Sequence, residues 1–509
     1  MLSSKKLINI AGWLAFAIAV VVFYLSAERV GSLWDCGEFI LGAYKLQVVH
    51  PPGAPLFMIV GRFFTLFAEL FSDDLSDIAF AVNLMSGVCT AFTAAFAAWT
   101  TGLFTKIAMV GPDAELDKGQ SWAAAGAALV AGLTTAFASS VWFSAVEGEV
   151  YAMSTFFTAM TIWSAVKWYS LPNVVENDRW LVFSLFAAGL SVGVHLLSLL
   201  ALPALGLLYY YKKYDNRNVM GALISIGAGL LYMVFIQKIV IAYIPLLWAK
   251  LEIFCVNSLG LPFHSGLVPT VLLVGGLAYF LLKYAHRENN QLLQLVTVIA
   301  TLNVIAFSLI GVIVIRANAD TPVNMNVPSD ALRLVPYINR EQYGERPLLF
   351  GPSYQAEPSG SNSEKVYGQV GDRYEYVSDK ISYKYRNKDK MLFPRLADMT
   401  ASRKQIYDLW RTNTVGDAKG RPNMSDNIRF LVAYQLKWMY GRYFMWNFVG
   451  RQNGDQGYFS WDKASGNWRS GIKFIDDARL YNSDNEPDRL KNSEANNNYY
   501  FLPLIFGLI

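Results

Sequence analysis

Residues 7–26 read LINIAGWLAFAIAVVVFYLS, an almost entirely apolar run that follows Lys5 and Lys6. A secretory signal peptide has a shorter apolar core and a small-residue cleavage site. About 20 consecutive apolar residues are enough to cross a bilayer as a helix. The stretch therefore predicts an uncleaved first transmembrane helix with its preceding lysines on the cytoplasmic side.

Composition assigns much of the chain to the same class. Of its 509 residues, 54% are hydrophobic and 16% are charged, whereas a soluble domain has about 25% charged residues. The deficit lies in residues 1–315. The net charge of +4 argues against a nucleic-acid partner. The three cysteines are far apart and form no CxxC pair, so neither a zinc site nor a redox motif is predicted.

Further apolar runs predict a polytopic, mostly α protein. Trp180–Tyr211 is too long for one crossing and is interrupted at residues 191–195, which predicts two short helices. Pro55–Phe71 is short and contains Arg62, so we expect a surface helix and no crossing. The other predicted spans are Asp77–Thr105, Trp122–Phe143, Val150–Trp168, Val219–Trp248, Leu267–Leu282 and Leu292–Ile315.

Lysine and arginine give a consistent topology with the N-terminus inside, because short cytoplasmic loops carry the excess of these residues. The predicted outside loops contain only Arg29, Lys45, Arg62 and Lys250. The predicted inside loops contain Lys5, Lys6, Lys106, Lys118, Lys167, Arg179, Lys212, Lys213, Arg217, Lys283 and Arg287.

This topology divides the chain into three parts. Residues 1–315 form the transmembrane module, and residues 316–498 form an extracytoplasmic segment with mixed α and β character. Residues 499–509 read YYFLPLIFGLI, which predicts the start of a further transmembrane helix and a longer natural chain.

The first outside loop contains acidic residues beside aromatic ones, at Trp34-Asp-Cys-Gly-Glu-Phe39. Asp35 and Glu38 share a face if they lie on a short helix. A carboxylate in a partly dry site suits a general base that takes a proton from a hydroxyl. The alternative is that Asp35 caps the helix and Glu38 completes a capping box. His50-Pro-Pro-Gly, further along, also reads as a rigid turn.

Other predicted outside turns supply further candidates. Glu147 and Glu149 flank Gly148 at the membrane edge, where they are either substrate-binding groups or solvated loop charges. His195 lies at the third turn and is either functional or a hydrogen-bonded packing residue. A phosphate-bearing donor needs basic groups, for which Arg62, His50 and Arg316 are candidates. Arg316 alternatively serves as an interfacial anchor.

Several strings of residues then resemble a known family. Trp34-Asp-Cys-Gly-Glu-Phe, His50-Pro-Pro-Gly-Ala-Pro-Leu and Val146-Glu-Gly-Glu-Val-Tyr-Ala occur in the order seen in the domain-of-unknown-function family DUF2723. That family includes animal transmembrane O-mannosyltransferases that act on plexin-type receptors, and many Bacteroidetes proteins. Tyr337-Ile-Asn-Arg-Glu-Gln-Tyr-Gly and Arg442-Tyr-Phe-Met-Trp-Asn-Phe-Val-Gly-Arg-Gln-Asn resemble its bacterial branch.

The resemblance implies a GT-C glycosyltransferase, which is a transmembrane helical bundle with an acidic catalytic residue in its first extracytoplasmic loop. It implies that Asp35 is the catalytic base and that Glu38 is its partner. Glu149 corresponds to a second acidic residue, and His50 precedes the surface helix. The implied donor is a polyprenyl-phosphate-linked sugar.

The sequence and the resemblance together predict a membrane enzyme. It would transfer a mannose-like hexose, with inversion, to Ser/Thr hydroxyls of exported proteins, on the periplasmic face of the cytoplasmic membrane. No cofactor is expected, although Asp35, Glu38 and Glu149 suit a divalent cation. One alternative is a lipid or glycan transporter, but the predicted spans hold few charges, chiefly Lys238. The other is a non-catalytic membrane scaffold.

Overall fold

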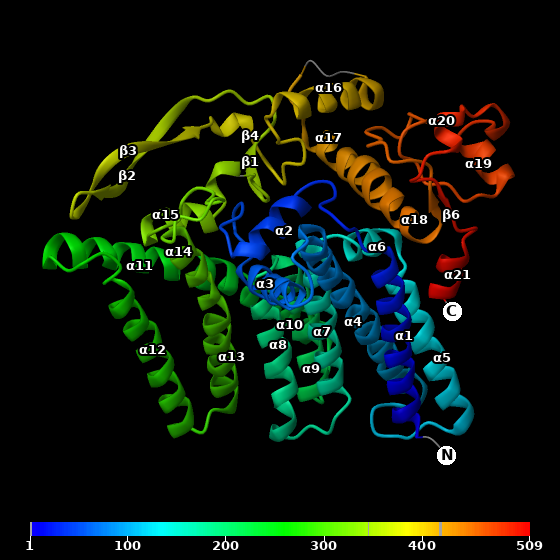
Figure 1. The fold of residues 1–509 in the computed structure, drawn as a ribbon, viewed down its shortest axis with the longest axis horizontal. Coiled ribbons are helices and arrows are strands. Elements are labelled where there is room, and N and C mark those ends of the chain that lie inside the picture. Colours follow the sequence, from blue (N-terminus) through cyan, green and yellow to red (C-terminus); the bar gives the residue numbers. More distant parts are fainter. Residues whose placement is uncertain (1–2, 345, 417–419, 509) are drawn as a thin grey trace. The chain divides into compact units, whose positions relative to one another are not determined.

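The computed structural model describes residues 3–344, 346–416 and 420–508 (Figure 1). It is mostly helical, and the strands of the described residues pair into three two-stranded sheets. The chain divides into two compact units. The first comprises Met1–Gln342 and Gly368–Glu375, and the second comprises Tyr343–Tyr367 and Tyr376–Ile509.

Five helices of the described residues are long and apolar enough to cross a membrane, which supports the predicted membrane class. They are Ser4–Ser26 (α1), Leu75–Val110 (α4), Val219–Ser258, Leu267–Arg287 (α12) and Gln291–Ala317. Val219–Ser258 combines α10 (Val219–Phe235), a π-helical segment (Ile236–Tyr243), α11 (Ile244–Ile253) and a second π-helical segment (Phe254–Ser258). Gln291–Ala317 combines α13 (Gln291–Phe307), a short 3-10 turn and α14 (Gly311–Ala317).

The predicted span over Trp122–Phe143 is bent and is not one straight helix. Lys118–Ala136 (α5) and Ser139–Ala145 (α6) meet at an angle of 66°. Phe137 and Ala138 leave the helical region between them, with ψ angles of 8° and 133°. The Thr135 hydroxyl also donates to the Ala131 carbonyl, 2.8 Å away, and such back-bonding often bends a helix.

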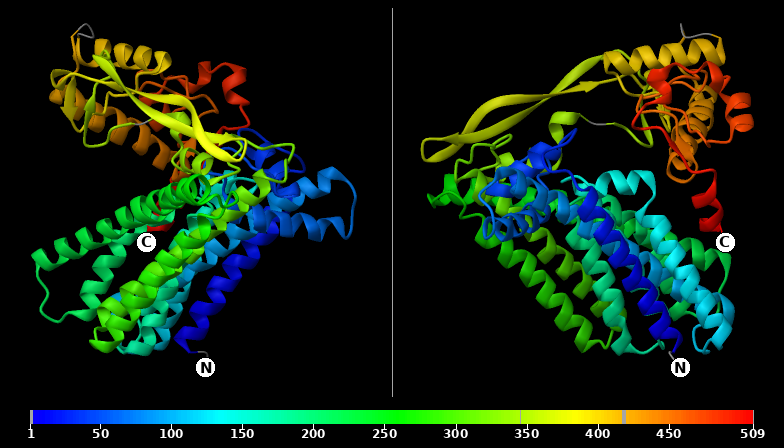
Figure 2. Two further views of the ribbon diagram at one scale, coloured as in Figure 1. Left: turned by 90° about the vertical axis from the view of Figure 1, so that its left-hand side faces the viewer. Right: turned by 45° about the vertical axis from the view of Figure 1, so that its right-hand side comes forward.

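Shorter helices complete the first unit. Val150–Tyr169 (α7) leads to Arg179–Ser191 (α8), and a 3-10 segment at Leu196–Ala201 separates α8 from Leu202–Lys213 (α9). The interruption predicted at residues 191–195 is therefore confirmed. Pro55–Glu69 (α3) has 15 residues, too few for a perpendicular crossing. It lies with Cys36–Lys45 (α2) at one end of the bundle (Figures 1 and 2).

Small residues allow α1, α4 and α5 to approach closely. Ala15 on α1, Ala94 and Ala98 on α4 and Ala128 on α5 are fully buried in one cluster. A Cβ atom on Gly132 of α5 would lie 2.8 Å from the Ala94 carbonyl oxygen. Close packing of small residues is a favoured way to join helices in a lipid environment, where apolar surface alone gives no driving force.

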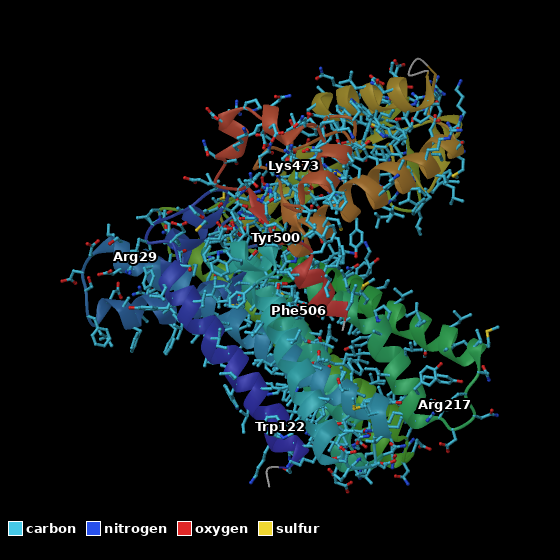
Figure 3. The ribbon with its side chains drawn as sticks, turned by 90° about the vertical axis from the view of Figure 1, so that its right-hand side faces the viewer. Arg29, Trp122, Arg217, Lys473, Tyr500 and Phe506 are labelled. Atoms are coloured by element: carbon cyan, nitrogen blue, oxygen red, sulfur yellow. The ribbon has the colours of Figure 1, made fainter. Side chains whose placement is uncertain are left out.

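The two ends of the helix bundle carry different parts of the sequence. Trp122 and Arg217 lie toward the end that holds the N-terminus, while Arg29 lies at the other end with α2 and α3 (Figure 3). This separation agrees with the arrangement that the lysine and arginine count requires.

Two arginines fix the C-terminal end of α2. Arg62 Nη1 donates to the Tyr44 carbonyl over 2.6 Å and also forms an ion pair with Glu69. Arg316 Nε donates to the Leu46 carbonyl over 2.7 Å, and its Nη2 donates to Lys45 O over 3.1 Å. Cations at this end of a helix satisfy carbonyls that have no partner in the helix and complement its dipole.

The segment that follows α2 is held by residues beyond the last predicted span. Val48 forms a parallel bridge with Asn324. The Tyr337 hydroxyl, on Ala331–Ile338 (α15), donates to the Val49 carbonyl. Gly53 has a φ of +88°, and a Cβ atom there would lie 2.6 Å from the Tyr337 hydroxyl oxygen. Because of these contacts, the first unit continues past the predicted boundary at residue 315.

The second unit combines small sheets with helices. Phe350–Pro352 (β1) pairs antiparallel with Lys390–Leu392 (β4), and Gly450–Arg451 (β5) pairs antiparallel with Asn497–Asn498 (β6). Gly360–Val370 (β2) and Arg373–Lys384 (β3) form the third sheet, of which Gly368–Glu375 is part of the first unit. The helices are Ala401–Val415 (α16), Met424–Arg429 (α17), Arg442–Phe448 (α18), Lys473–Arg479 (α19), Asp488–Lys491 (α20) and Leu502–Leu508 (α21), with a π-helical segment at Phe430–Gly441. Its core is aromatic, formed by Tyr354, Tyr407, Trp410, Phe430, Tyr434 and Trp438 with Leu396.

Replacing Tyr337 by Phe tests the link between α15 and the segment after α2. The buried hydroxyl is removed and the Val49 carbonyl loses this donor, so we expect the free energy of unfolding to fall by about 1 kcal/mol. The measurement is thermal unfolding of the full chain in detergent. Tyr279→Phe, at an exposed position of α12, should leave the midpoint unchanged. An equal midpoint for both variants would contradict this role of Tyr337.

Candidate functional site

Two loops that are far apart in the sequence are joined at the α2 end of the first unit. The buried Asn83 side chain of α4 donates to the carbonyls of Glu28 and Val30 over 2.7 and 3.0 Å. Glu28 N donates to the Val146 carbonyl over 2.9 Å. The Ser32 hydroxyl donates to the Glu147 carboxylate. These bonds hold the first loop against the turn at residues 146–149.

Asp35 begins α2 without capping it. Trp34, immediately before it, has a positive φ of 62°, and Asp35 itself has φ −87° and ψ 0°. Its side chain accepts no capping bond from the helix, and 58% of that side chain is exposed. The alternative in which Asp35 is a helix cap within a capping box is therefore wrong. The carboxylate remains accessible to a ligand.

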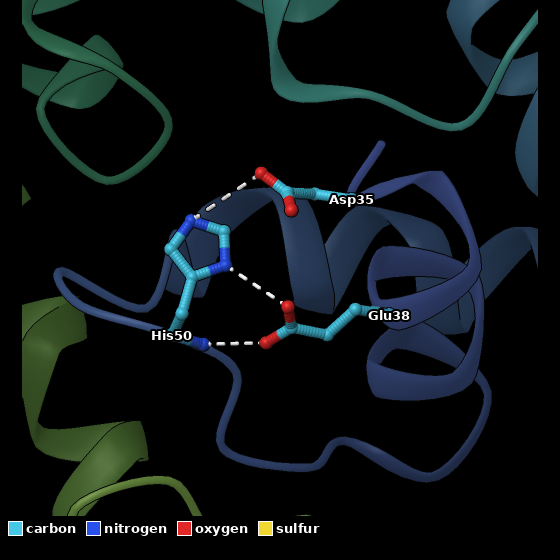
Figure 4. A group of neighbouring side chains, drawn as sticks. All are labelled: Asp35, Glu38 and His50. Carbon is cyan, nitrogen blue, oxygen red and sulfur yellow. Dashed lines mark hydrogen bonds and ion pairs between the residues drawn. The ribbon is translucent and has the colours of Figure 1, made fainter. Parts of the chain in front are cut away.

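The Glu38 carboxylate interacts with His50 and does not form a capping box at the start of α2. One carboxylate oxygen accepts the His50 backbone N–H over 2.6 Å, and the other lies 3.1 Å from His50 Nδ1 (Figure 4). The Phe39 ring meets the imidazole edge-on, with centroids 5.4 Å apart. The imidazole is thus held at two points, and a carboxylate that accepts from Nδ1–H leaves Nε2 as the outward-facing nitrogen.

His50 Nε2 points toward Asp35. The nitrogen lies 3.9 Å from Asp35 Oδ2, which is beyond ordinary hydrogen-bond distance (Figure 4). The sequence prediction that Asp35 and Glu38 share one face of a helix agrees with this convergence on His50. An Asp, a Glu and a His from two segments are therefore arranged around one point.

Glu149 is the buried acid beside this group. Its carboxylate accepts backbone N–H bonds from Val150 and Asp35, and only 4% of the residue is exposed. Burial is the main cause that raises its pKa from 4.5 to about 7, and the negative charges of Asp35 and Glu147 add to the effect. Burial likewise raises the pKa of Glu147, which the bond from Ser32 partly offsets. These two glutamates are not solvated loop charges.

Asp35 and Glu149 therefore have opposite environments within one site. One is an exposed carboxylate, and the other is a buried carboxyl that holds its proton near neutral pH. A buried acid that holds its proton next to an exposed one is a common basis for acid and base roles. The arrangement can accept a proton at Asp35 and hold or return one at Glu149.

His195 lies on the next loop, between α8 and the following 3-10 segment. Its ring centroid is 5.7 Å from that of Tyr151, and its buried Nδ1 has no hydrogen-bond partner among the described residues. Burial and the nearby positive charge of Arg340 lower its pKa. A neutral imidazole with an unused nitrogen fits a ligand-facing role as well as a packing role.

Arg340 is the site residue that sequence reasoning did not select. It follows α15, has a φ of 55°, and its positive charge helps to lower the pKa of His195. The string Tyr337-Ile-Asn-Arg contains it, and the resemblance of this string to other proteins does not indicate a role for the arginine. Its position depends on the fold of residues 317–342 onto the first unit, which no local pattern predicts.

The predicted cations Arg62 and Arg316 lie at the other end of α2. Their guanidinium groups bind the carbonyls of residues 44–46, whereas Asp35 precedes the first residue of the helix. A helix of 10 residues is about 15 Å long. Their phosphate-binding roles remain predictions, and their contacts in the structure are with the end of α2.

The site also has a set of groups that suits a divalent cation. Asp35, Glu38 and His50 each offer one ligand atom, and these atoms lie within 4.8 Å of one another. The sequence-based set had Glu149 in place of His50. Carboxylate oxygens and an imidazole nitrogen suit several divalent metals, and a His whose second nitrogen is held by a carboxylate is a usual form of metal ligand.

Comparison with known proteins adds an independent observation. Residues 35–218 match the family model described as the Protein O-mannosyl-transferase TMEM260 N-terminal domain. The matched segment contains Asp35, Glu38, His50, Arg62, Glu147, Glu149 and His195. Residues 344–432 match a family of unknown function, DUF8416.

Two curated relatives match in the same way. The chain is 25% identical over 167 residues to protein O-mannosyl-transferase tmem260 of Dictyostelium discoideum, which is 33% of this chain and 18% of the relative. It is 27% identical over 177 residues to protein O-mannosyl-transferase TMEM260 of Mus musculus, which is 35% of this chain and 22% of the relative. The match thus spans less than a quarter of either relative. No solved structure matches the chain.

The raised pKa of Glu149 predicts how the stability of the protein changes with pH. In the folded protein the Glu149 carboxyl has a pKa of about 7, whereas its ordinary value is 4.5. The contribution of this group to stability is therefore fully present below pH 4.5 and is lost as the pH rises through 7. Glu149→Gln stays neutral, so its stability relative to wild type should be higher at pH 8 than at pH 5. Thermal midpoints of both proteins at the two pH values provide the measurement. A difference that does not change with pH would show that Glu149 is ionised throughout.

Proposed function

We propose that this protein is a membrane glycosyltransferase that moves a mannose-like hexose from a polyprenyl-phosphate-linked donor to Ser/Thr hydroxyls of exported proteins. The observation that carries the proposal is the convergence of Asp35, Glu38, His50 and Glu149 at one end of a membrane helix bundle. All four lie in the segment that matches a protein O-mannosyl-transferase domain. A carboxylate base next to a buried acid suits transfer to a hydroxyl.

In the proposed reaction, Asp35 takes the proton of the acceptor hydroxyl. The hydroxyl oxygen then attacks C1 of the sugar, and the bond between C1 and the phosphate oxygen breaks. The product carries the opposite configuration at C1, and the polyprenyl phosphate leaves as an anion. Glu38 acts through His50, since it fixes the imidazole that faces Asp35.

The departing phosphate needs positive or proton-donating groups on the same side. His50 is adjacent to Asp35, and Arg340 lies near Tyr151 and His195. Arginine suits phosphate because its planar guanidinium can donate two parallel bonds. We therefore assign the donor phosphate to the side of the site that carries Arg340, in preference to Arg62 and Arg316.

The lysine and arginine distribution supports a site outside the cytoplasm. The loops that carry Asp35, Glu147 and His195 are all on the side with few cations. A periplasmic site in the inner membrane would meet exported proteins after translocation. The lipid-linked donor would reach the same side from within the bilayer.

Replacement of Asp35 by Asn tests the function. In cells that lack the gene, wild type should restore glycosylation of exported proteins, and Asp35→Asn should restore at least about 100-fold less, which is the lower range for a lost general base. Glycan on exported proteins is read by mass spectrometry at matched membrane levels. Asp73→Asn, an exposed acid between α3 and α4, is the control and should act as wild type.

Full restoration by Asp35→Asn would remove Asp35 from the mechanism and move the base to Glu38 or Glu149. Failure of wild type itself to restore any glycan would favour the transport or scaffold alternatives.

Replacement of Arg340 tests the phosphate assignment. Arg340→Gln should raise the KM for the lipid-linked donor about tenfold or more, because a charge-assisted bond is lost, and should change kcat less. Arg340→Lys should recover part of the loss. Arg333→Gln, on the exposed side of α15, should have the parameters of wild type. An unchanged donor KM in Arg340→Gln would assign the phosphate elsewhere.

A further inference from the structure

Residues 424–448 of the second unit form one continuous helical run. It begins at α17 with a capping box formed by Asn423 and Asp426, continues through the π-helical segment Phe430–Gly441, and ends with α18. At 1.5 Å per residue, an α-helix of this length would extend about 37 Å. π-helical turns are wider than α-helical ones, so residues four apart remain more nearly aligned along the axis.

One face of this run packs on the aromatic core of its own unit. Phe430, Tyr434, Trp438 and Arg442 recur every fourth residue and are buried. The Arg442 guanidinium lies over the rings of Trp438 and Trp446, at 4.4 and 4.6 Å, and donates to the Gln456 carbonyl over 3.2 Å. These contacts fix the rotation of the run about its own axis.

The fixed rotation exposes a second apolar row. Ile428, Val432, Leu436 and Tyr440 also recur every fourth residue, and they are 51%, 54%, 52% and 64% exposed. Met424, Met439, Tyr443 and Phe444 are exposed beside them. We call these eight residues the apolar stripe. The exposed positions of the run include Arg429 and Lys437 and contain no acidic residue.

A second apolar element, α21, lies close to the C-terminal end of the run. β5 follows the run directly and pairs with β6, and Tyr499 N donates to the Val449 carbonyl over 2.9 Å. The segment that follows contains α21, which exposes Leu502, Ile505, Phe506 and Leu508. Figure 3 labels Tyr500 and Phe506 along this segment, and Figure 1 shows α18 and α21 as neighbours in the second unit. The stripe and α21 therefore meet at one corner of the unit.

We propose that the apolar stripe binds the surface of the lipid bilayer, with the helical run lying in the interfacial layer. A soluble surface rarely exposes so extended an apolar row without a partner. The second unit is joined to a chain with five candidate membrane spans, so a bilayer is always within reach. Apolar and aromatic side chains flanked by Lys and Arg are the composition of helices that lie in a membrane interface. Because α21 exposes further apolar side chains next to α18, we expect the corner of the unit that holds both helices to reach the bilayer.

The cations beside the stripe, Arg429 and Lys437, indicate which lipid headgroups the stripe should prefer. Arg429 and Lys437 can extend their apolar stems along the membrane surface and place their charges at the headgroups. Anionic headgroups would strengthen this contact. The inference rests on the membrane class of the chain and not on the sugar-transfer chemistry, so either one can fail alone.

The test uses the full chain in nanodiscs of phosphatidylethanolamine and phosphatidylglycerol. A spin label is attached at Val432→Cys or Leu436→Cys after Cys36, Cys89 and Cys255 are replaced by Ala. Collision rates are compared for oxygen, which concentrates in the bilayer, and for a water-soluble nickel complex. Thr412→Cys on an exposed position of α16 is the matched control, and Lys437→Cys provides a stripe-edge site that keeps the apolar row intact.

The proposal expects the ratio of oxygen to nickel collisions at residues 432 and 436 to be several-fold higher than at residue 412, with residue 437 intermediate. A ratio equal to that at residue 412 would place the stripe in water. Low collision rates with both reagents would show that protein covers the stripe, either from this chain or from a partner. Either of these two results would overturn the proposal.

Discussion

The contact on which the candidate site depends is the pair of polar interactions between Glu38 and His50. One Glu38 carboxylate oxygen accepts the His50 backbone N–H, and the other lies 3.1 Å from Nδ1 of the same histidine. This pair joins the first turn of α2 to the segment that leads into α3. Without it, the imidazole would lose its orientation and Asp35 would lose its neighbour. The arginines at the far end of α2 also hold the site in position, since they fix the helix that carries Glu38 and follows Asp35.

Burial then decides how the acidic residues differ. Asp35 is exposed and forms no capping hydrogen bond with α2. Glu149, in contrast, is buried beside the backbone of Asp35 and near the negative charges of Asp35 and Glu147. The same residue type in the neighbouring turn, Glu147, is held by a hydroxyl from the first loop. One cluster therefore contains carboxyl groups in three different environments, and such differences can assign neighbouring carboxyl groups to proton-acceptor and proton-donor roles.

The sequence predicts the membrane class, most helix positions and the break at residues 191–195, because apolar length and interruption are local properties. It also predicts that Asp35 and Glu38 share one helix face. It does not predict the bend between α5 and α6, because Phe137 and Ala138 look like the apolar residues around them. It does not predict that Arg340 influences His195, because that depends on how residues 317–342 pack within the first unit. It gives Arg62 and Arg316 as candidates for binding a phosphate, which stay predictions, but it does not show that both guanidinium groups bind carbonyls at the end of α2.

The central claim is that the Asp35 cluster transfers a sugar. Its most direct test is reconstitution of the purified full-length chain in liposomes with radiolabelled polyprenyl-phosphate mannose and a Ser/Thr-rich acceptor peptide. Label should appear on peptide hydroxyls with wild type and not with Asp35→Asn. Movement of the labelled lipid between leaflets with no label on the peptide would contradict it and would identify a transporter.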